Sequence, residues 1–406
     1  MSVSAPAAAI ASHDLVSPDL PSEPHAPTLA APIGPAPSDP APGPARALRL
    51  ATDPRPDLKS MTHAELRAFV TETLAEPAFR ADQIFRWLHG RGARSFETMT
   101  DLSKGLRDKL LTSARVGGLE LEDVMVAKDG TRKLLLRTGQ GDRIESVLIP
   151  MEDRITQCVS SQVGCKIGCD FCFTARMPLR RHLAASEIAD QVLWAQKVLT
   201  DAGQGERVSN LVYMGMGEPM DNYDNVVRSL RILMDDRGQN ISSRRITVSS
   251  SGVVPKLQKL GHDVPINLAI SLNASNDEQR NRLIPINKVW NLEALMTTLR
   301  AYPLPPRRRI TMEYVMLADV NDTKDDALRV AKLLRGLRCK VNLIPFNPWP
   351  GSIYRRPTPE AVDRFAMILM DRGYTVTVRY SKGDDIGAGG GPLDGNQVAP
   401  ATGDAP

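Results

Sequence analysis

The chain has 406 residues, of which 42% are hydrophobic and 24% charged, with five cysteines and a formal net charge of +4 at pH 7. This size predicts a globular protein with a large core and more than one domain. No run of 18 apolar residues and no secretory signal occurs, which argues against a membrane span and against disulfides. We therefore expect a cytoplasmic monomer.

Residues 1–56 read as a Pro/Ala-rich extension that we expect to be disordered. They hold 13 of the 31 prolines and three Lys or Arg against five Asp or Glu. Such a segment buries too little apolar surface to offset its ordering entropy. The rest of the chain then carries +6, with basic pairs such as Arg244–Arg245 that suit phosphate binding but fit a solvated surface equally well.

Residues 57–115 predict a small helical domain. Apolar residues recur at helical spacing in MTHAELRAFVTETL, Pro77 interrupts the pattern before FRADQIFRWLHGRG, and Ser103 suits the N-cap of a further helix. Residues 116–151 change to short apolar runs separated by glycine turns, which predicts a short β-rich connector.

Residues 152–386 alternate helical patterns with short apolar runs, an order that predicts an α/β fold with a parallel sheet. About six such units favour a partial (β/α)6 barrel, although a doubly wound sheet would give the same pattern. In both architectures functional residues gather where the strands end. Residues 387–406 are rich in Gly and Pro, and we expect a mobile loop and tail.

The most informative motif is the run GCKIGCDFCFT, which places Cys165, Cys169 and Cys172 in a Cys-x3-Cys-x2-Cys spacing. Three thiolates on a [4Fe-4S] cluster hold three irons and leave the fourth open. A zinc site usually needs a second cysteine pair, which is missing, and Cys158 lies seven residues before Cys165. The spacing is similar to that of radical S-adenosylmethionine (SAM) enzymes, whose open iron binds SAM.

Polar residues follow several of the predicted strands. In GMGEP, after NLVYM, the glycines would let the backbone approach a ligand, and Glu218 could hold an ammonium group. Ser249, Ser271–Asn273 and Asn347 place hydroxyls and amides at three more strand ends, where they could bind a ribose or a carboxylate. Ordinary turns and helix caps would use the same residue types.

From about Ser60 to Ile386 the chain resembles the RlmN/Cfr family of radical SAM RNA adenosine methyltransferases, most closely its RlmN branch. The likeness rests on FRADQIFRWLHGRG, ESVLIP, CVSSQVGCKIGCDFCFT, GMGEPMDN, SSSGVVP, LAISLNA, RLIPINK, NLIPFNPWPG and KGDDI. It implies a [4Fe-4S] cluster and SAM as cofactors, and methylation of carbon 2 of an adenosine in 23S ribosomal RNA and often in tRNA. It also implies RNA binding by the helical domain and an electron-donor flavoprotein or reductase as partner.

The resemblance assigns roles to individual residues. It implies that Cys165, Cys169 and Cys172 bind the cluster, that Glu145 accepts a proton, and that Cys158 resolves a covalent RNA–protein intermediate. The residues that it implies for SAM binding are Gly217, Glu218, Ser249, Ser271, Leu272, Asn273 and Asn347. On its own, Glu145 would read as a solvated strand residue and Cys158 as a small buried side chain.

The chain departs from the family pattern at Gly390. Family members carry there the cysteine that one SAM methylates before a radical from a second SAM activates the methyl group. Glycine has no side chain to methylate, and the one remaining thiol, Cys339, begins a predicted strand about fifty residues upstream. Three hypotheses follow: an RNA methyltransferase with an unusual relay or an inactive one, a radical SAM enzyme for another substrate, or a non-catalytic RNA-binding protein.

Overall fold

The computed structural model describes residues 53–152, 154–203 and 207–388. Their main feature is a ten-stranded sheet in the order β1-β2-β3-β4-β7-β8-β9-β10-β11-β12, accompanied by a two-stranded ribbon of β5 and β6. Neighbouring strands from β4 to β12 are parallel, and those from β1 to β4 are antiparallel. Within these residues, no helix combines the length and the apolar character that crossing a bilayer requires.

The strands are short, as expected for a parallel sheet. They are β1 Leu119–Val126, β2 Arg132–Thr138, β3 Arg143–Met151, β4 Arg154–Cys158, β5 Gln162–Val163, β6 Arg181–His182, β7 Val208–Tyr213, β8 Ile246–Ser250, β9 Asn267–Ser271, β10 Ile310–Met316, β11 Cys339–Pro345 and β12 Val376–Val378. The α-helices are α1 His63–Ala68, α2 Phe79–Phe85, α3 Lys104–Ser113, α4 Ala185–Asp201, α5 Tyr223–Met234, α6 Val254–Asp263, α7 Asp277–Leu283, α8 Leu292–Arg300, α9 Lys324–Leu333 and α10 Pro359–Asp371.

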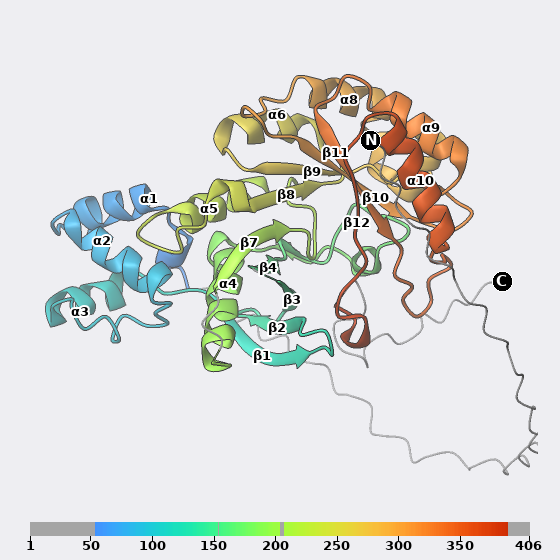
Figure 1. The fold of residues 1–406 in the computed structure, drawn as a ribbon. Coiled ribbons are helices and arrows are strands. Elements are labelled where there is room, and N and C mark those ends of the chain that lie inside the picture. The colour runs from blue at the N-terminus through green and yellow to red at the C-terminus, as the bar shows by residue number, and fades with distance from the viewer. Residues whose placement is uncertain (1–52, 153, 204–206, 389–406) are drawn as a thin grey trace, which may run out of the picture. The chain divides into compact units, whose positions relative to one another are not determined.

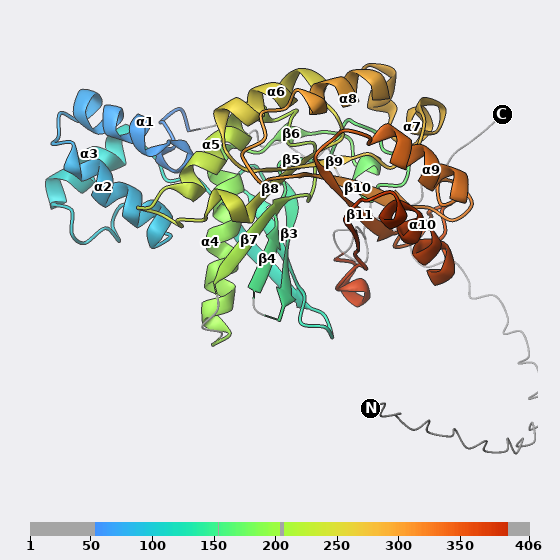
Figure 2. The same ribbon diagram turned by 45° about the horizontal axis from the view of Figure 1, so that its top comes forward.

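Helices and parallel strands alternate from β4 onward, which confirms the predicted α/β class and its partial barrel. The helices that follow β7 to β11 lie outside the curved sheet, as Figures 1 and 2 show. The strands expected as a separate connector are continuous with the barrel, because β3 pairs with β4 from Val147 opposite Cys158 to Met151 opposite Arg154. One wall of the barrel is therefore built from the antiparallel strands.

The N-terminal helices begin where the sequence predicts. Thr62 caps α1 in a capping box with Glu65, and the hydroxyl of Ser103 accepts a hydrogen bond from the amide of Leu106 at the start of α3. Each of these caps satisfies helix amides that have no partner within the helix. One π-helical turn each continues α1 and α2, over Phe69–Thr73 and Arg86–Gly90.

A buried ion pair connects the N-terminal helical region to the barrel. The Lys59 ammonium donates to the carboxylate of Asp190 in α4 at 2.6 Å, and both side chains are buried. Arg94 and the amide of Leu119 donate to the other carboxylate oxygen. A buried carboxylate is costly unless its oxygens are hydrogen-bonded. The hydrogen bonds from these three donors therefore offset the cost of burying Asp190.

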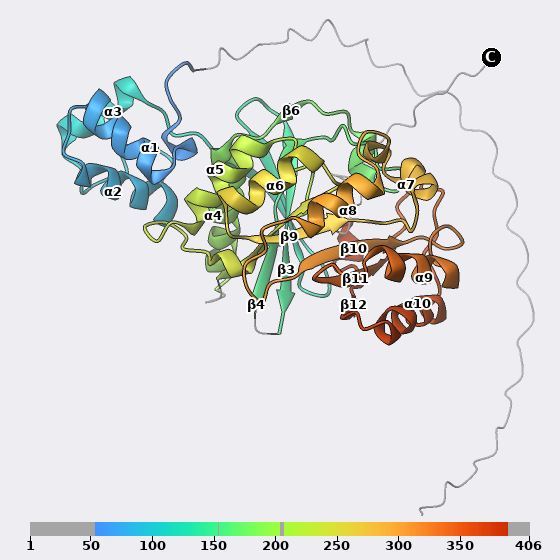
Figure 3. The ribbon, with the colours of Figure 1, turned by 90° about the horizontal axis from the view of Figure 1, so that it is seen from above.

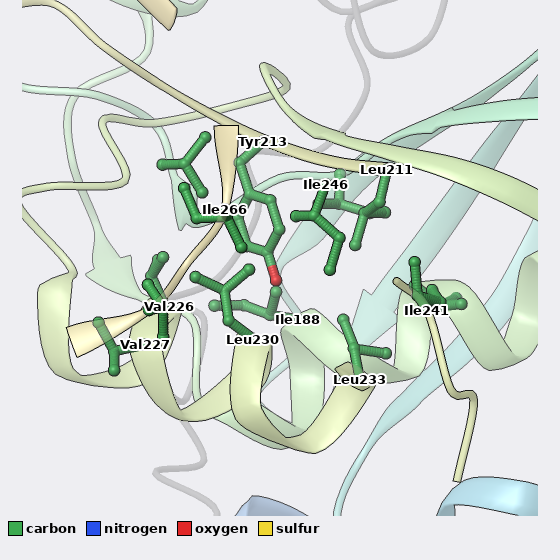
Figure 4. Packing of buried hydrophobic residues seen from close by; sticks show 14 of the residues in the cluster. Ile188, Leu211, Tyr213, Val226, Val227, Leu230, Leu233, Ile241, Ile246 and Ile266 are labelled. Atoms are coloured by element: carbon green, nitrogen blue, oxygen red, sulfur yellow. The ribbon is translucent and has the colours of Figure 1, made fainter. Parts of the chain in front are cut away.

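The core lies between the sheet and its helices (Figures 3 and 4). Leu211 and Tyr213 of β7 face Ile188 of α4 and Leu230 of α5, and all four side chains are nearly inaccessible to solvent. The hydroxyl of Tyr213 is hydrogen-bonded to that of Ser229 at 2.9 Å, so this buried polar group is satisfied. Packing on the outer side leaves the inner side of the sheet available for a site.

Candidate active site

The inner side of the barrel contains a cavity of about 1100 Å³. Its wall takes alternate residues from each strand, such as Thr311, Glu313 and Val315 of β10, because successive side chains of a strand point to opposite faces. Four of the residues expected in the site, Glu145, Cys158, Cys172 and Asn347, line this one cavity. The fold therefore unites residues that lie about 200 positions apart in the sequence.

The three motif cysteines lie in a loop between β5 and β6. The amide of Cys165 donates to the carbonyl of Met177 at 3.1 Å, and the amide of Cys172 donates to the carbonyl of Cys169 at 3.0 Å. Burial raises the pKa of Cys165 to about 11 and also raises that of Cys169, and the charges of the neighbouring thiolates and of Glu218 act in the same direction. Three thiols gathered in this way become anionic most readily when a cation binds them.

This donor set suits an iron–sulfur cluster. Three thiols in one loop are the ligands that such clusters take, and a four-iron cluster holds each thiolate on a different iron. A zinc ion instead draws its thiolates to about 2.3 Å from one centre. Among residues 53–152, 154–203 and 207–388, no three His, Cys, Asp or Glu side chains are grouped closely enough to hold one metal ion.

Glu218 is fixed in the strand-end loop after β7. It is 5% exposed, and one carboxylate oxygen accepts hydrogen bonds from the amide and the hydroxyl of Ser251, each at 2.8 Å. The other oxygen accepts from the amide of Met220 at 3.0 Å. Burial raises the pKa of Glu218, and these hydrogen bonds oppose the rise. The carboxylate is thus oriented and poorly hydrated, a condition that favours pairing with a cationic group.

Position 217 requires glycine because of its backbone conformation and because the side chain of Gln162 lies close to it. Its φ is +98°, and a Cβ built on it would lie 2.5 Å from the Cβ of Gln162. The side chain of Gln162 accepts from the amide of Glu218 at 2.8 Å and donates to Asp221 at 2.8 Å. Gln162 directly precedes the cysteine loop, so it connects that loop to GMGEP.

Arg280 is the main residue that the sequence did not reveal. It lies in α7, has no measurable exposure, and donates to the carbonyls of Ser251, Ser271 and Leu272 at 2.7, 3.0 and 3.1 Å. A fourth hydrogen bond, of 2.9 Å, goes to the amide oxygen of Asn287. Burial lowers the pKa of Arg280 to about 10, so the guanidinium remains charged at neutral pH. Arg280 thus joins the ends of β8 and β9.

The remaining expected SAM-binding residues lie at or beyond the same strand ends. Ser249 is near the end of β8 and is buried. Asn273 has a φ of +53°, and its side-chain oxygen accepts from the amide of Val315 at 2.7 Å. Asn347 donates to Asp384 at 2.9 Å and accepts from Arg356 at 2.6 Å.

Glu145 and Cys158 form the opposite wall of the cavity. Glu145, in β3, lies 3.1 Å from the ammonium of buried Lys133 in β2. Cys158 is the last residue of β4, and burial raises its pKa to about 11, while the charge of Arg379 opposes the rise. Gly390 lies outside the described residues. Cys339 begins β11, at the end of the strand opposite to Asn347, which agrees with the expectation that it lies away from the site.

Comparison with known proteins identifies the family. A model described as the ribosomal RNA large subunit methyltransferase N-terminal domain matches residues 56–116, and the Radical SAM superfamily model matches residues 159–334. The dual-specificity RNA methyltransferase RlmN of Geobacter sulfurreducens is 48% identical over 84% of this chain and 92% of its own length. The chain belongs to the RlmN family. The RlmN protein of Marinobacter nauticus is 45% identical over 84% of this chain and 92% of its own.

A solved structure agrees with this membership of the RlmN family. A radical SAM methyltransferase from Sphaerobacter thermophilus superposes with a TM-score of 0.77 and 43% identity, covering 82% of this chain and 97% of that one. The RlmN family and this likeness confirm the predicted fold and the predicted class of enzyme, a SAM-dependent methyltransferase of the radical type.

Proposed function

We propose that this protein methylates carbon 2 of an adenosine in 23S ribosomal RNA, and in tRNA as well, in the cytoplasm. RNA as substrate is supported by the names of its relatives, which are dual-specificity RNA methyltransferases. The observation that carries the proposal is that Glu145, Cys158 and Cys172 line one cavity. In this proposal a proton acceptor, a thiol and a cluster ligand would face one substrate.

The strand-end loops would hold the cofactors. Cys165, Cys169 and Cys172 would bind a [4Fe-4S] cluster, and Glu218 would pair with the ammonium group of SAM. The other residues proposed to bind SAM are Gly217, Ser249, Ser271, Leu272, Asn273 and Asn347. When bound, cluster and SAM supply a 5′-deoxyadenosyl radical after one electron arrives from a flavoprotein or reductase.

The opposite wall would act on the base. Carbon 2 of adenine is electrophilic, so it does not attack the methyl group of SAM directly. Glu145 would take the proton that leaves carbon 2, with Lys133 orienting its carboxylate from 3.1 Å. In the family, the cysteine at the position of Cys158 releases the RNA from a link to the relay sulfur by thiol chemistry. Cys158 would have this role here only with a relay sulfur, and residue 390 is glycine. We propose that the helical region, residues 57–115, binds the RNA outside the cavity.

Gly390 supports a second candidate function. Ala388, two residues earlier in the sequence, lines the cavity, whereas the residue at 390 carries no thiol. A radical SAM enzyme that forms 5′-deoxyadenosyl radical and uses it on another substrate would need the cysteine loop and the strand-end network but no relay cysteine. A non-catalytic RNA-binding protein would need neither the cysteine loop nor the relay cysteine.

The test is to reconstitute the cluster, add SAM, reductant and ribosomal RNA, and measure 5′-deoxyadenosine and 2-methyladenosine separately. Both products support the proposed methyltransferase. 5′-Deoxyadenosine alone favours the second candidate, and neither product favours RNA binding without catalysis. Gly390→Cys is the matched variant, and Gly390→Ser is its control because serine restores a side chain without a thiol. Methylation restored by cysteine alone would identify the missing sulfur as the only defect.

A further inference from the structure

The segment that follows β12 forms part of the cavity wall. Val378, Arg379, Tyr380, Ser381 and Lys382 all line the cavity, and we refer to residues 378–382 as the lip. The lip is held at both ends, because the amide of Arg379 donates to the carbonyl of Leu343 in β11 at 2.8 Å. At its other end, the ammonium of Lys382 donates to the carbonyl of Pro150 in β3 at 3.0 Å.

The next residues continue this attachment across the open side of the barrel. The amide of Gly383 donates to Asp129 at 3.0 Å, and the amide of Lys128 donates to Asp385 at 3.1 Å. Both contacts join the segment to the turn between β1 and β2, beside which the red ribbon after β12 lies in Figure 1. The lip therefore bridges two walls of the cavity as a fixed element.

Two side chains of the lip are exposed although they line the cavity. Tyr380 is 54% exposed and lines the cavity, so its ring is accessible to a ligand there. Arg379 is also exposed, and no hydrogen bond or ion pair in the described part of the chain involves its guanidinium. Burial raises the pKa values of Cys158 and Glu313, and the positive charge of Arg379 opposes both rises. Arg379 lines the same cavity as these two residues.

The charges of the cavity favour an anionic ligand. Among the described residues, two carboxylates line it, those of Glu145 and Glu313, and Glu313 accepts a hydrogen bond from Asn342 at 2.6 Å. The cationic side chains that line it are those of Arg154, Arg244, Arg245, Lys340, Arg379 and Lys382. A polyanion that enters such a cavity is attracted by these cations, and a guanidinium binds phosphate oxygens in a bidentate manner.

We propose that the lip binds a nucleotide adjacent to the target adenosine, with Tyr380 stacked on its base and Arg379 paired with its phosphate. The proposal rests on the proposed function, in which RNA is the substrate. An aromatic ring beside a guanidinium suits any neighbouring base, because every base offers a π face and every nucleotide a phosphate. The lip would thus hold the strand while the target base lies between Glu145 and Cys158.

The test uses binding, so it does not depend on turnover. A hairpin RNA that contains the target adenosine carries 2-aminopurine at the position before or after it, and its fluorescence is measured on addition of the cluster-reconstituted full chain. We expect quenching at one of the two positions by the wild type and by Tyr380→Phe. Tyr380→Leu, which keeps bulk without a π face, should lose that quenching and bind about tenfold more weakly by fluorescence anisotropy.

Arg379→Gln tests the phosphate contact through its salt dependence. Removing one contact to a single strand should reduce the slope of log K against log salt by about 0.7. Arg335→Gln is the matched control, because Arg335 is exposed and does not line the cavity. Iron content and SAM cleavage measured without RNA should equal those of the wild type in all variants, which shows that each one is folded.

The outcomes separate the two proposals. If the wild type binds the hairpin but Tyr380→Leu quenches like Tyr380→Phe and Arg379→Gln keeps the wild-type slope, the lip proposal is wrong and the proposed function stands. If the wild type does not bind the hairpin, both are wrong. Equal loss of salt slope in Arg335→Gln would also overturn the lip proposal, because the effect would then reflect total charge.

Discussion

Replacing Arg280 by methionine should both destabilise the chain and weaken SAM binding. The substitution keeps an unbranched apolar side chain but removes four hydrogen bonds, three of them to carbonyls at the ends of β8 and β9. Each buried acceptor left without a partner costs about 1–3 kcal/mol, and near the lower end of that range four acceptors cost about 6 kcal/mol. Part of this loss is recovered, because the buried guanidinium no longer has to be desolvated.

The recovered part follows from the pKa of Arg280. Burial lowers it from 12.5 to about 10, which corresponds to about 3 kcal/mol against the charged form. The net expectation is therefore a loss of about 3 kcal/mol in the free energy of unfolding. Urea unfolding followed by tryptophan fluorescence measures it, and isothermal titration of the cluster-reconstituted protein with SAM measures the loosening of the strand-end loops.

Arg355→Met is the matched control for this variant. Arg355 pairs with Asp319 at 2.6 Å and both side chains are largely exposed, so its loss should cost less than about 1 kcal/mol. If Arg280→Met unfolds within 1 kcal/mol of the wild type and binds SAM normally, the network around Arg280 does not support the site. Equal losses in the two arginine variants would lead to the same conclusion.

Three further changes have defined outcomes. Asp190→Asn removes a buried charge that accepts hydrogen bonds from three donors. The free energy of unfolding, measured in urea, should therefore fall by about 3–5 kcal/mol. Burial lowers the pKa of His89 to about 3, so below about pH 6.5 the unfolded chain binds a proton that the folded chain does not. Stability should therefore fall by about 1 kcal/mol between pH 7 and pH 5.5, and His89→Phe should remove this part of the fall. Gly217→Ala and its control Gly336→Ala should each lose about 1 kcal/mol of stability through backbone strain, because φ is +98° at Gly217 and +78° at Gly336. SAM binding should be lost in Gly217→Ala alone, because its Cβ meets Gln162.

Each of these expectations has a contradicting result. An unchanged urea midpoint in Asp190→Asn would show that the connection between helical region and barrel does not depend on that carboxylate. A pH profile of His89→Phe identical to that of the wild type would assign the fall to other groups. Glycine variants with equal SAM affinity would show that Gln162 moves aside for the new methyl group.

The sequence predicted features whose signals are local. Ser103 as a helix cap, the glycine turns within residues 116–151 and the cysteine spacing each depend on fewer than ten neighbouring residues. The structure has the cap where expected, and a glycine turn at Gly130 joins β1 to β2. The curved sheet could also be anticipated, because alternation of helices and apolar runs leaves few topologies. The continuity of β1–β3 with the barrel could not be anticipated, because the pattern of apolar residues does not show which strands pair.

The contacts that the sequence did not reveal join residues that lie far apart in the chain. Arg280 reaches back 29 residues to Ser251, and Lys59 meets Asp190 across 131 residues. In the sequence, a charged residue in DEQRNRL reads as solvated surface, because charged side chains are rarely buried unless paired. Arg379 lies in no motif, and only the fold brings it to the same cavity as Cys158. Pairing over such distances is a property of the fold and has no local signal.

The two walls of the cavity are built and held by different parts of the chain. The cysteine loop, GMGEP and the ends of β8 and β9 are joined through Gln162, Ser251 and Arg280. Glu145 and Cys158 lie on β3 and β4, and Lys133 of β2 pairs with Glu145. Each of these contacts joins residues between 133 and 280, so none of them depends on a side chain at position 390. A defect caused by Gly390 should for this reason affect methyl transfer and leave SAM affinity and RNA binding intact.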